Sequence, residues 1–250
     1  LLSSTAATRA IAVTPVNDAP TTSAVTLTAI AEDSGVRVIT QTELLANAND
    51  VDGDTLTASG LAISAGSGGA LADNLNGTWN YTPAANDNTS VSFSYTISDG
   101  NGGSVAGTAT MDITPVNDAP VVSSIEATAL SYAENAAATA ITSSATVSDV
   151  DNTNLSSATV QITANYVNGE DVLAFANTLT ITGAWNSGTG TLTLSGSDTL
   201  ANYQTALRAV TYANTSDNPS ALTRTVTFIV NDGLLSSTAA TRAIAVTPVN

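Results

Sequence analysis

The sequence contains no histidine, no cysteine and no lysine, and aromatic residues make up only 4% of its 250 residues. Without these three residue types, the usual general bases and nucleophiles are missing, so catalysis is disfavoured. The absence of cysteine does not indicate a compartment, because a secreted domain with an adequate core needs no disulfide. No apolar run approaches the ~20 residues that span a bilayer. The composition therefore favours a non-catalytic protein that does not insert into membranes.

Positive charge is also scarce. Five arginines are the only cations against 21 acidic residues, which gives a net charge of −16. Nucleic acids and anionic membrane surfaces bind to basic patches, so both are disfavoured as partners. Divalent cations are the natural counter-charge.

The length and the hydrophobic content of 43% fit two domains that each bury a core. The opening LLSSTAATRA has no basic start and no apolar stretch, so it is not a signal peptide. Either the sequence is a fragment or its export is directed from elsewhere.

One short string, TPVNDAP, occurs at residues 14–20 and 114–120, and TPVN returns at 247–250. Residues 1–17 are identical to residues 234–250, at an offset of 233 residues. This period is too long for a solenoid unit, so it indicates a tandem array whose repeat contains two different domains. We expect residues 1–15 to be the terminal strand of a preceding repeat, followed by domains at 16–115 and 116–250.

Within both domains the pattern is all-β. Asn-Gly and Asp-Gly turn signals separate runs of alternating polar and apolar residues, as in β-sandwiches. The expected strands are VTLTAI (25–30), VSFSYTI (91–97), TATMDIT (108–114), TLTIT (178–182), TLTLS (191–195) and TRTVTFIV (223–230).

One stretch, residues 197–212, departs from the strand pattern. Leu200, Tyr203 and Leu207 fall at helical spacing after a cap at Asp198 or Thr199, so we expect a short helix. The expected aromatic and apolar core residues are Trp79, Tyr81 and Phe93 in the first domain and Trp185, Phe228 and Ile229 in the second.

Acidic residues follow the same order in both domains: an early glutamate, Asp-x-Asp about 17 residues later, Asp-Gly near the end and Asn-Asp in the linker. Oxygen-rich sets of this kind suit Ca²⁺, which takes six to eight oxygen ligands. The two carboxylates of Asp-x-Asp project to the same side of an extended chain and can reach one ion. The candidate metal ligands are Asn17, Asp18, Glu32, Asp50, Asp52, Asp99, Asn117, Asp118, Glu134, Asp149, Asp151 and Asp232.

Simpler explanations exist for single members of the series. Asp-Gly is a turn signal, which is the first interpretation of Asp99 and Asp232 taken singly, and acidic loops also keep proteins soluble. DVDGD is not an EF-hand loop, because Gly53 is at its fourth position and Leu61 replaces the bidentate glutamate. Repetition of the whole series in two domains of different length favours calcium.

The ordered set Glu…Asp-x-Asp…Asn-Asp-x-Pro resembles the cadherin-like domains of giant bacterial cell-surface adhesins of the repeats-in-toxin type. LLANANDVDGDTL, NGTWNYTPAAN, SYTISDGNGGS and ITPVNDAP carry the resemblance in the first domain; TVSDVDNTNL and VTFIVNDG carry it in the second. The resemblance covers nearly the whole chain. It implies two tandem immunoglobulin-like or cadherin-like Greek-key β-sandwiches, joined end to end through Ca²⁺.

The function that the resemblance implies is a calcium-stiffened extender, or stalk, on the bacterial surface or secreted from it, which supports adhesion or biofilm attachment. The implied partners are the neighbouring repeats of the same protein. Glu32 and Asp99 would then meet Asn117, Asp118, Asp149 and Asp151 at one joint. At the entrance, Asn17 and Asp18 would pair with Asp50 and Asp52, and at the exit Glu134, Asp232 and Asn250 would face the next repeat.

The linker departs from the cadherin pattern at one position. Cadherin linkers carry an aspartate two residues before the linker asparagine, where this sequence has Pro15 or Pro115. We therefore expect one or two ions at a joint, with the prolines adding stiffness because proline fixes φ. TPVNDAP is interpreted as a joint whose Asn and Asp supply oxygen ligands.

Three further interpretations remain open. An exposed Trp185 could stack on a sugar, which would make the protein a carbohydrate-binding module. Threonines at alternate positions in TLTIT and TLTLS could form a flat surface-binding array. The N-terminal strand could add to a sheet edge of a neighbouring chain, giving head-to-tail pairing.

Overall fold

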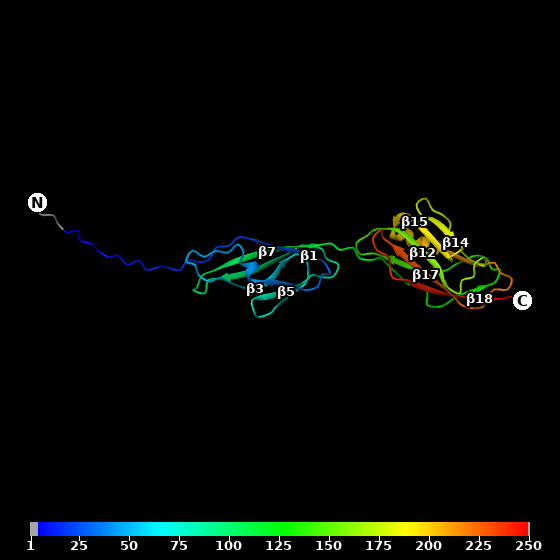
Figure 1. The fold of residues 1–250 in the computed structure, drawn as a ribbon, viewed down its shortest axis with the longest axis horizontal. Helices are drawn as coiled ribbons and strands as arrows, with labels where there is room; N and C mark the ends of the chain where they lie inside the picture. Colours follow the sequence, from blue (N-terminus) through cyan, green and yellow to red (C-terminus); the bar gives the residue numbers. More distant parts are fainter. Residues whose placement is uncertain (1–4, 250) are drawn as a thin grey trace. The chain divides into compact units, whose positions relative to one another are not determined.

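The computed structural model describes residues 5–249, which form two compact units divided between Val116 and Asn117. Asn250, expected at the exit, lies outside the described residues. Both units are all-β sandwiches, as the sequence predicts, and Figure 1 shows the strands of each. No helix among the described residues is long and apolar enough to cross a membrane.

The first unit packs two sheets face to face. One sheet has the order β1-β7-β6-β3 and the other β2-β5-β4. Its elements are β1 (Val25–Ala31), β2 (Arg37–Thr40), α1 (Gln41–Leu44), β3 (Thr57–Ala65), β4 (Ala70–Asp73), β5 (Thr78–Thr82), β6 (Val91–Ser98) and β7 (Ser104–Thr114).

Strict alternation of side chains builds this first core. In β6, for example, every second residue from Val91 to Ile97 is buried, because successive side chains of a strand point to opposite faces. Trp79, Tyr81 and Phe93 are core residues, as expected, and the rings of Tyr81 and Phe93 meet edge to face at 5.4 Å. The helix α1, which was not expected, is a single turn whose Thr40 and Glu43 form a reciprocal capping box.

The second unit contains a six-stranded sheet in the order β14-β15-β12-β17-β18-β9, with the smaller sheets β10-β16-β13 and β11-β8. Its elements are β8 (Val121–Ser123), β9 (Leu130–Ala133), β10 (Thr139–Ala140), β11 (Thr146–Ser148), β12 (Asn154–Ala164), β13 (Asp171–Ala174), β14 (Thr182–Asn186), β15 (Thr191–Thr199), α2 (Leu200–Ala209), β16 (Thr211–Asn214), β17 (Arg224–Asn231) and β18 (Ala240–Thr247).

The expected helix is α2, capped by Thr199, whose hydroxyl accepts the N–H of Asn202 at 3.2 Å. Two other expectations were wrong. TLTIT is a loop up to Ile181, because the Thr178 hydroxyl accepts the Ile181 N–H at 2.9 Å and closes a local turn. Ile229 is not a core residue, because it lies between Phe228 and Val230 and points to the opposite face of β17.

Both units share one topological feature. An early strand of each unit pairs in parallel with the last: β1, the first strand of its unit, with β7, and β9, the second strand of its unit, with β18. Residues that follow β1 therefore lie beside the end of β7, where the chain leaves the unit. The acids just after β1 and β9 are placed by this pairing.

Candidate metal centres

The acidic loop after α1 folds around its own first carboxylate. Asp50 Oδ1 accepts the backbone N–H groups of Asp52 at 2.9 Å and Asp54 at 3.4 Å. Asp50 Oδ2 is buried and has no hydrogen-bond partner. A buried, unpartnered carboxylate oxygen is costly without a proton donor or a cation beside it.

The linker before the first unit is fastened to this loop. The backbone N–H of Asp18 donates to Asp52 Oδ2 at 2.7 Å, and the Asn17 side-chain amide donates to Asp99 Oδ2 at 2.9 Å. We call Asn17, Asp18 and the acids they meet the first entrance cluster; its members are Asn17, Asp18, Asp50, Asp52, Asp54 and Asp99.

Asp99 is the most buried member of this cluster, at 4% exposure. The Asn17 amide, helped by the backbone N–H groups of Asn101 and Gly103, holds the pKa of the Asp99 carboxyl below its ordinary value against the effect of burial. Asp99 is therefore ionised at neutral pH. The turn that carries it, residues 99–103, joins β6 to β7.

Three carboxylates meet at the centre of the first entrance cluster. Oxygen atoms of Asp50, Asp54 and Asp99 all lie within 4.8 Å of one another. Like charges at this separation repel by roughly 3 kcal/mol per pair at an effective dielectric constant near 20. A hollow of about 370 Å³ adjoins them, lined by Pro15, Val16, Asn17, Asp52, Asp54 and Asn101. The arrangement suits a hard cation that takes oxygen ligands.

The second unit repeats the arrangement. Asp149 Oδ1 accepts the N–H groups of Asp151 at 2.9 Å and Asn152 at 2.8 Å, while Asp149 Oδ2 is buried and unpartnered. The Asp118 N–H donates to Asp151 Oδ2 at 2.7 Å. The members of this second entrance cluster are Asn117, Asp118, Asp149, Asp151, Asn152 and Asp232.

Asp232 takes the place that Asp99 has in the first unit. The Asn117 amide donates to Asp232 Oδ2 at 2.8 Å. Burial raises the pKa of the Asp232 carboxyl, but the hydrogen bonds from Asn117, Leu234 and Leu235 outweigh it and hold the pKa below its ordinary value. The linker asparagine and the linker aspartate therefore make the same pair of contacts in both clusters.

The two acidic loops differ after their Asp-x-Asp pair, where Gly53 and Asp54 of the first correspond to Asn152 and Thr153 of the second. Asn152 follows Asp151 directly, and its amide donates to Asn117 Oδ1 at 2.6 Å, which occupies that oxygen. In the first unit the third acid of the loop is Asp54, and Asp50, Asp54 and Asp99 are the one trio of acids brought this close in the described part of the chain. The second cluster therefore offers less negative charge to a cation.

The glutamates lie at the other end of each unit. Glu32 is 2% exposed, and its Oε1 accepts the N–H of Val116 at 2.8 Å, just beyond the end of β7. Its own N–H donates to Thr114 O at 2.9 Å. In the second unit the Glu134 N–H donates to Thr247 O at 3.0 Å, and Glu134 Oε2 is buried without a partner.

The expected grouping is therefore partly wrong. Asp99 was expected beside Glu32 and Asp232 beside Glu134, but both lie in the entrance clusters. Antiparallel pairing explains the difference, because the turn from β6 to β7 lies at the opposite end of the sheet from the point where β7 leaves. Asn17 correspondingly meets Asp99, while Asp18 meets Asp52 as expected. Asp54 and Asn152 were missing from the candidate ligands, although the spacing of DVDGD could have indicated Asp54.

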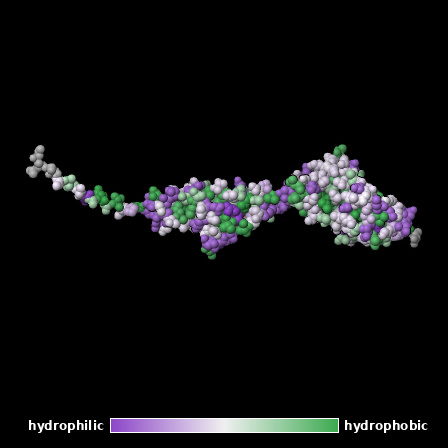
Figure 2. Space-filling view, in the orientation of Figure 1, coloured by the Kyte–Doolittle hydropathy of each residue, from purple (hydrophilic) through white to green (hydrophobic). Residues whose placement is uncertain are grey.

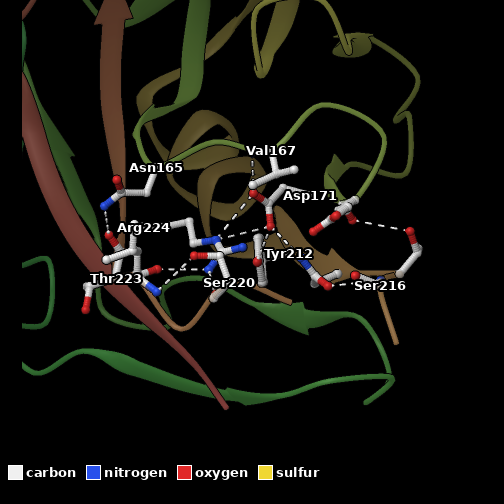
Figure 3. Close-up of polar contacts among 12 residues, drawn as sticks. Asn165, Val167, Asp171, Tyr212, Ser216, Ser220, Thr223 and Arg224 are labelled. Carbon is white, nitrogen blue, oxygen red and sulfur yellow. Dashed lines mark hydrogen bonds and ion pairs between the residues drawn. The ribbon is translucent and has the colours of Figure 1, made fainter. Parts of the chain in front are cut away.

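A separate polar cluster is closed to solvent. The Asp171 carboxylate, 1% exposed, accepts from the Tyr212 hydroxyl at 2.6 Å, the Asn214 amide at 2.7 Å and the Val167 N–H at 2.8 Å (Figure 3). Arg224, fully buried, pairs with Asp171 at 3.3 Å and donates to the carbonyls of Ser220 and Leu222. This cluster ties two loops to the core and is structural.

A second hollow, of about 450 Å³, lies between α2 and the loop of residues 175–181 and is mainly apolar. The acid in its wall, Asp198, already accepts hydrogen bonds from Thr180, Thr199 and Asn202. Trp185 is half-buried and its ring lies edge to face with that of Tyr166, at 6.2 Å between ring centroids, so it is not the exposed aromatic that the sugar-binding interpretation requires.

Comparisons with known proteins found one family model and several solved structures that are similar to parts of this chain. Residues 16–114, most of the first unit, match the family model of the cadherin-like domain. Human protocadherin-24 EC1-2 is 18% identical, with 92% of this chain and 100% of that chain covered and a TM-score of 0.45. Protocadherin gamma B2 extracellular cadherin domains 1-5 are 15% identical, with 94% and 40% covered and a TM-score of 0.41.

An endo-fucoidan hydrolase from glycoside hydrolase family 107 is 20% identical, with 93% of this chain covered and a TM-score of 0.30. The chain spans 29% of the length of that hydrolase. None of the curated proteins compared with the chain matches it.

Proposed function

We propose that this chain is a calcium-binding spacer module of a large extracellular bacterial adhesin. In this proposal its units are joined end to end and stiffened by Ca²⁺, and they support cell adhesion or biofilm attachment. The observation that carries the proposal is that each unit fastens its preceding linker to acids that leave one buried carboxylate oxygen unpartnered, Asp50 Oδ2 or Asp149 Oδ2.

The chemistry of the ligands favours calcium over softer metals. Both entrance clusters offer only carboxylate, amide and backbone oxygens, and the sequence has no His or Cys to hold zinc or copper. Asp50, Asp54 and Asp99 would supply the charged ligands of the first site, and Asn17 and Asn101 lie close enough to contribute neutral oxygens. Extracellular modules bind calcium with dissociation constants of roughly 10⁻⁴–10⁻³ M, which suits external calcium.

Calcium would act on the linker. Asn117 and Asp118 follow β7 of the first unit by only a few residues, and they are also members of the second entrance cluster. An ion bound there would fix the residues that connect one unit to the next. Without it, the facing carboxylates repel and the linker is held by hydrogen bonds alone. Pro115 and Pro120 further restrict the backbone on either side.

Two parts of the proposal, the tandem array and its location at the cell surface, are supported by the sequence. Identity between residues 1–17 and 234–250 supports a tandem repeat, and cadherin-like domains are extracellular modules. The carbohydrate-binding alternative loses its main support with the half-buried Trp185, and a flat threonine array loses the TLTIT strand.

Titration calorimetry of the full chain with CaCl₂ tests the proposal, with MgCl₂ as the comparison cation. We expect binding in the range of 10⁻⁴–10⁻³ M and a tighter first site. Asp50→Asn should weaken the first site at least tenfold, and Asp149→Asn should do the same at the second. Asp112→Asn is the matched control, because it removes one exposed charge outside both clusters. Equal titration curves for Asp50→Asn, Asp149→Asn and the control would overturn the proposal.

A further inference from the structure

An eight-residue sequence occurs in two different environments in this chain. Residues 7–14 and 240–247 both read ATRAIAVT. In the second copy, which is β18, Ile244 is 0% and Val246 is 3% exposed. In the first copy, Ile11 is 84% and Val13 is 87% exposed. Figure 2 shows hydrophobic surface along this N-terminal segment.

The position of β18 defines what this sequence fits. β18 lies between two strands, antiparallel to β17 from Arg224↔Ile244 to Phe228↔Ala240 and parallel to β9 from Ile244↔Leu130 to Thr247↔Ala133. Both of its edges are hydrogen-bonded, and its apolar side chains enter the core of the second unit.

Arginine sets the register of this strand. Arg242 forms an ion pair with Glu126 at 3.2 Å and donates to the carbonyls of Thr128 at 3.2 Å and Ile141. Glu126 is itself held by Thr142 and Ser143, whose hydrogen bonds lower its pKa although burial raises it. A strand must therefore carry an arginine two residues before its first buried isoleucine to fit this groove.

Residues 7–14 meet every one of these requirements. Arg9 corresponds to Arg242, Ile11 to Ile244 and Val13 to Val246. We infer that residues 7–14 are a second β18 strand, whose docking site is the groove between β17 and β9 in the 117–250 unit of a second copy of this chain.

The mode of docking is strand exchange. The described residues of each copy contain one such groove and two strands of the same sequence, and β18 of the same copy holds the groove through its high effective concentration. When β18 detaches from the groove, residues 7–14 of a neighbouring copy can take its place and form the same contacts, because the two sequences are identical. Donor segment and groove are different surfaces of the chain, so the contact is head-to-tail, and it links copies into a ring where the rotation closes and into an open chain where it does not.

A full-chain variant with a defective β18 tests the inference. Ile244→Asp with Val246→Asp excludes β18 from the groove but leaves residues 7–14 intact. We expect head-to-tail oligomers by size-exclusion chromatography with light scattering, whose mass rises with concentration. Adding Ile11→Asp and Val13→Asp to the same chain should return it to monomers. Monomers from both variants would overturn the inference.

Disulfide trapping tests the same inference in a chain with an intact β18, and so remains informative if the aspartate variants do not fold. The chain has no cysteine, and Ala10 corresponds to Ala243, which lies opposite Thr225. In an otherwise unchanged chain, Ala10→Cys with Thr225→Cys, warmed and then oxidised, should give a ladder of linked oligomers. Thr14→Cys with Thr225→Cys is the out-of-register control, and we expect at least tenfold less linkage from it. Equal linkage from the two pairs, or none from either, would contradict strand exchange.

Discussion

At the scale of single residues, the first entrance cluster depends on the close approach of the Gly103 backbone to the Asp99 side chain and to the linker at Ala19. A Cβ atom at Gly103 would lie 2.2 Å from Asp99 Oδ2 and 2.9 Å from Ala19 Cα. Glycine at this position is what lets the linker and the Asp99 carboxylate lie side by side. Asn17 and Asp99 could not keep their hydrogen bond if this space were filled.

Gly103→Ala should therefore displace Asp99. We expect a loss of about 1–3 kcal/mol in the free energy of unfolding of the first unit, as for other overpacked sites, and at least tenfold weaker calcium binding there. Urea denaturation and calorimetry measure the two effects. Gly68→Ala is the control, because nothing lies within 4 Å of a Cβ at Gly68. Equal effects of the two substitutions would contradict this account of Gly103.

The buried Tyr203 makes the stability of the second unit depend on pH in the alkaline range. Burial raises the pKa of Tyr203 to about 12, and its hydroxyl donates to Gly196 O at 2.6 Å. Because the folded pKa is higher than the unfolded value of about 10, the folded state binds the proton more tightly. The stabilisation is complete below pH 10 and is lost as the pH rises toward 12.

Urea denaturation between pH 8 and pH 12 should follow this loss. The free energy of unfolding of the second unit should fall over the upper half of that range. Tyr203→Phe should be less stable at pH 8 and show a shallower fall above pH 10. A steeper fall for Tyr203→Phe than for the unchanged chain would contradict the assignment.

At the scale of elements, α2 shows how local signals decide a boundary. Its single capping bond comes from Thr199, which also ends β15. Thr199→Ala should cost about 1 kcal/mol of the second unit's stability, as for other N-cap threonines. Thr205→Ala, inside the same helix, should cost less because alanine favours helix. Thermal unfolding compares the two, and a larger loss for Thr205→Ala would show that the cap is not at Thr199.

Alternation and turn signals predicted most of the long strands, because each of these strands has one face in the core. The strand expected at TLTIT did not form, because the Thr178 hydroxyl accepts a hydrogen bond from the nearby Ile181 backbone, which alternation does not reveal. The acids of the entrance clusters could be selected from their repeated order. Their grouping could not, since it depends on which end of a sheet each turn occupies. The pairing of Asp171 with Arg224 joins residues 53 apart and has no local signal.

At the scale of the whole molecule, the two units use one plan with different charge. Each fastens its linker through an asparagine to a buried or half-buried aspartate and through an N–H to Asp-x-Asp. Only the first adds a third close carboxylate in the described part of the chain. Calcium should therefore occupy the two sites in order, the first unit before the second.

Small-angle X-ray scattering of the full chain, in 5 mM CaCl₂ and in chelator, tests the central claim most directly, with Asp149→Asn as the variant in which the site at the linker is weakened. The proposal predicts that calcium narrows the distribution of particle dimensions, because the linker becomes fixed. It also predicts that Asp149→Asn removes most of this change while Asp112→Asn keeps it. The same distribution with and without calcium, in a chain that calorimetry shows to be loaded, would contradict calcium stiffening.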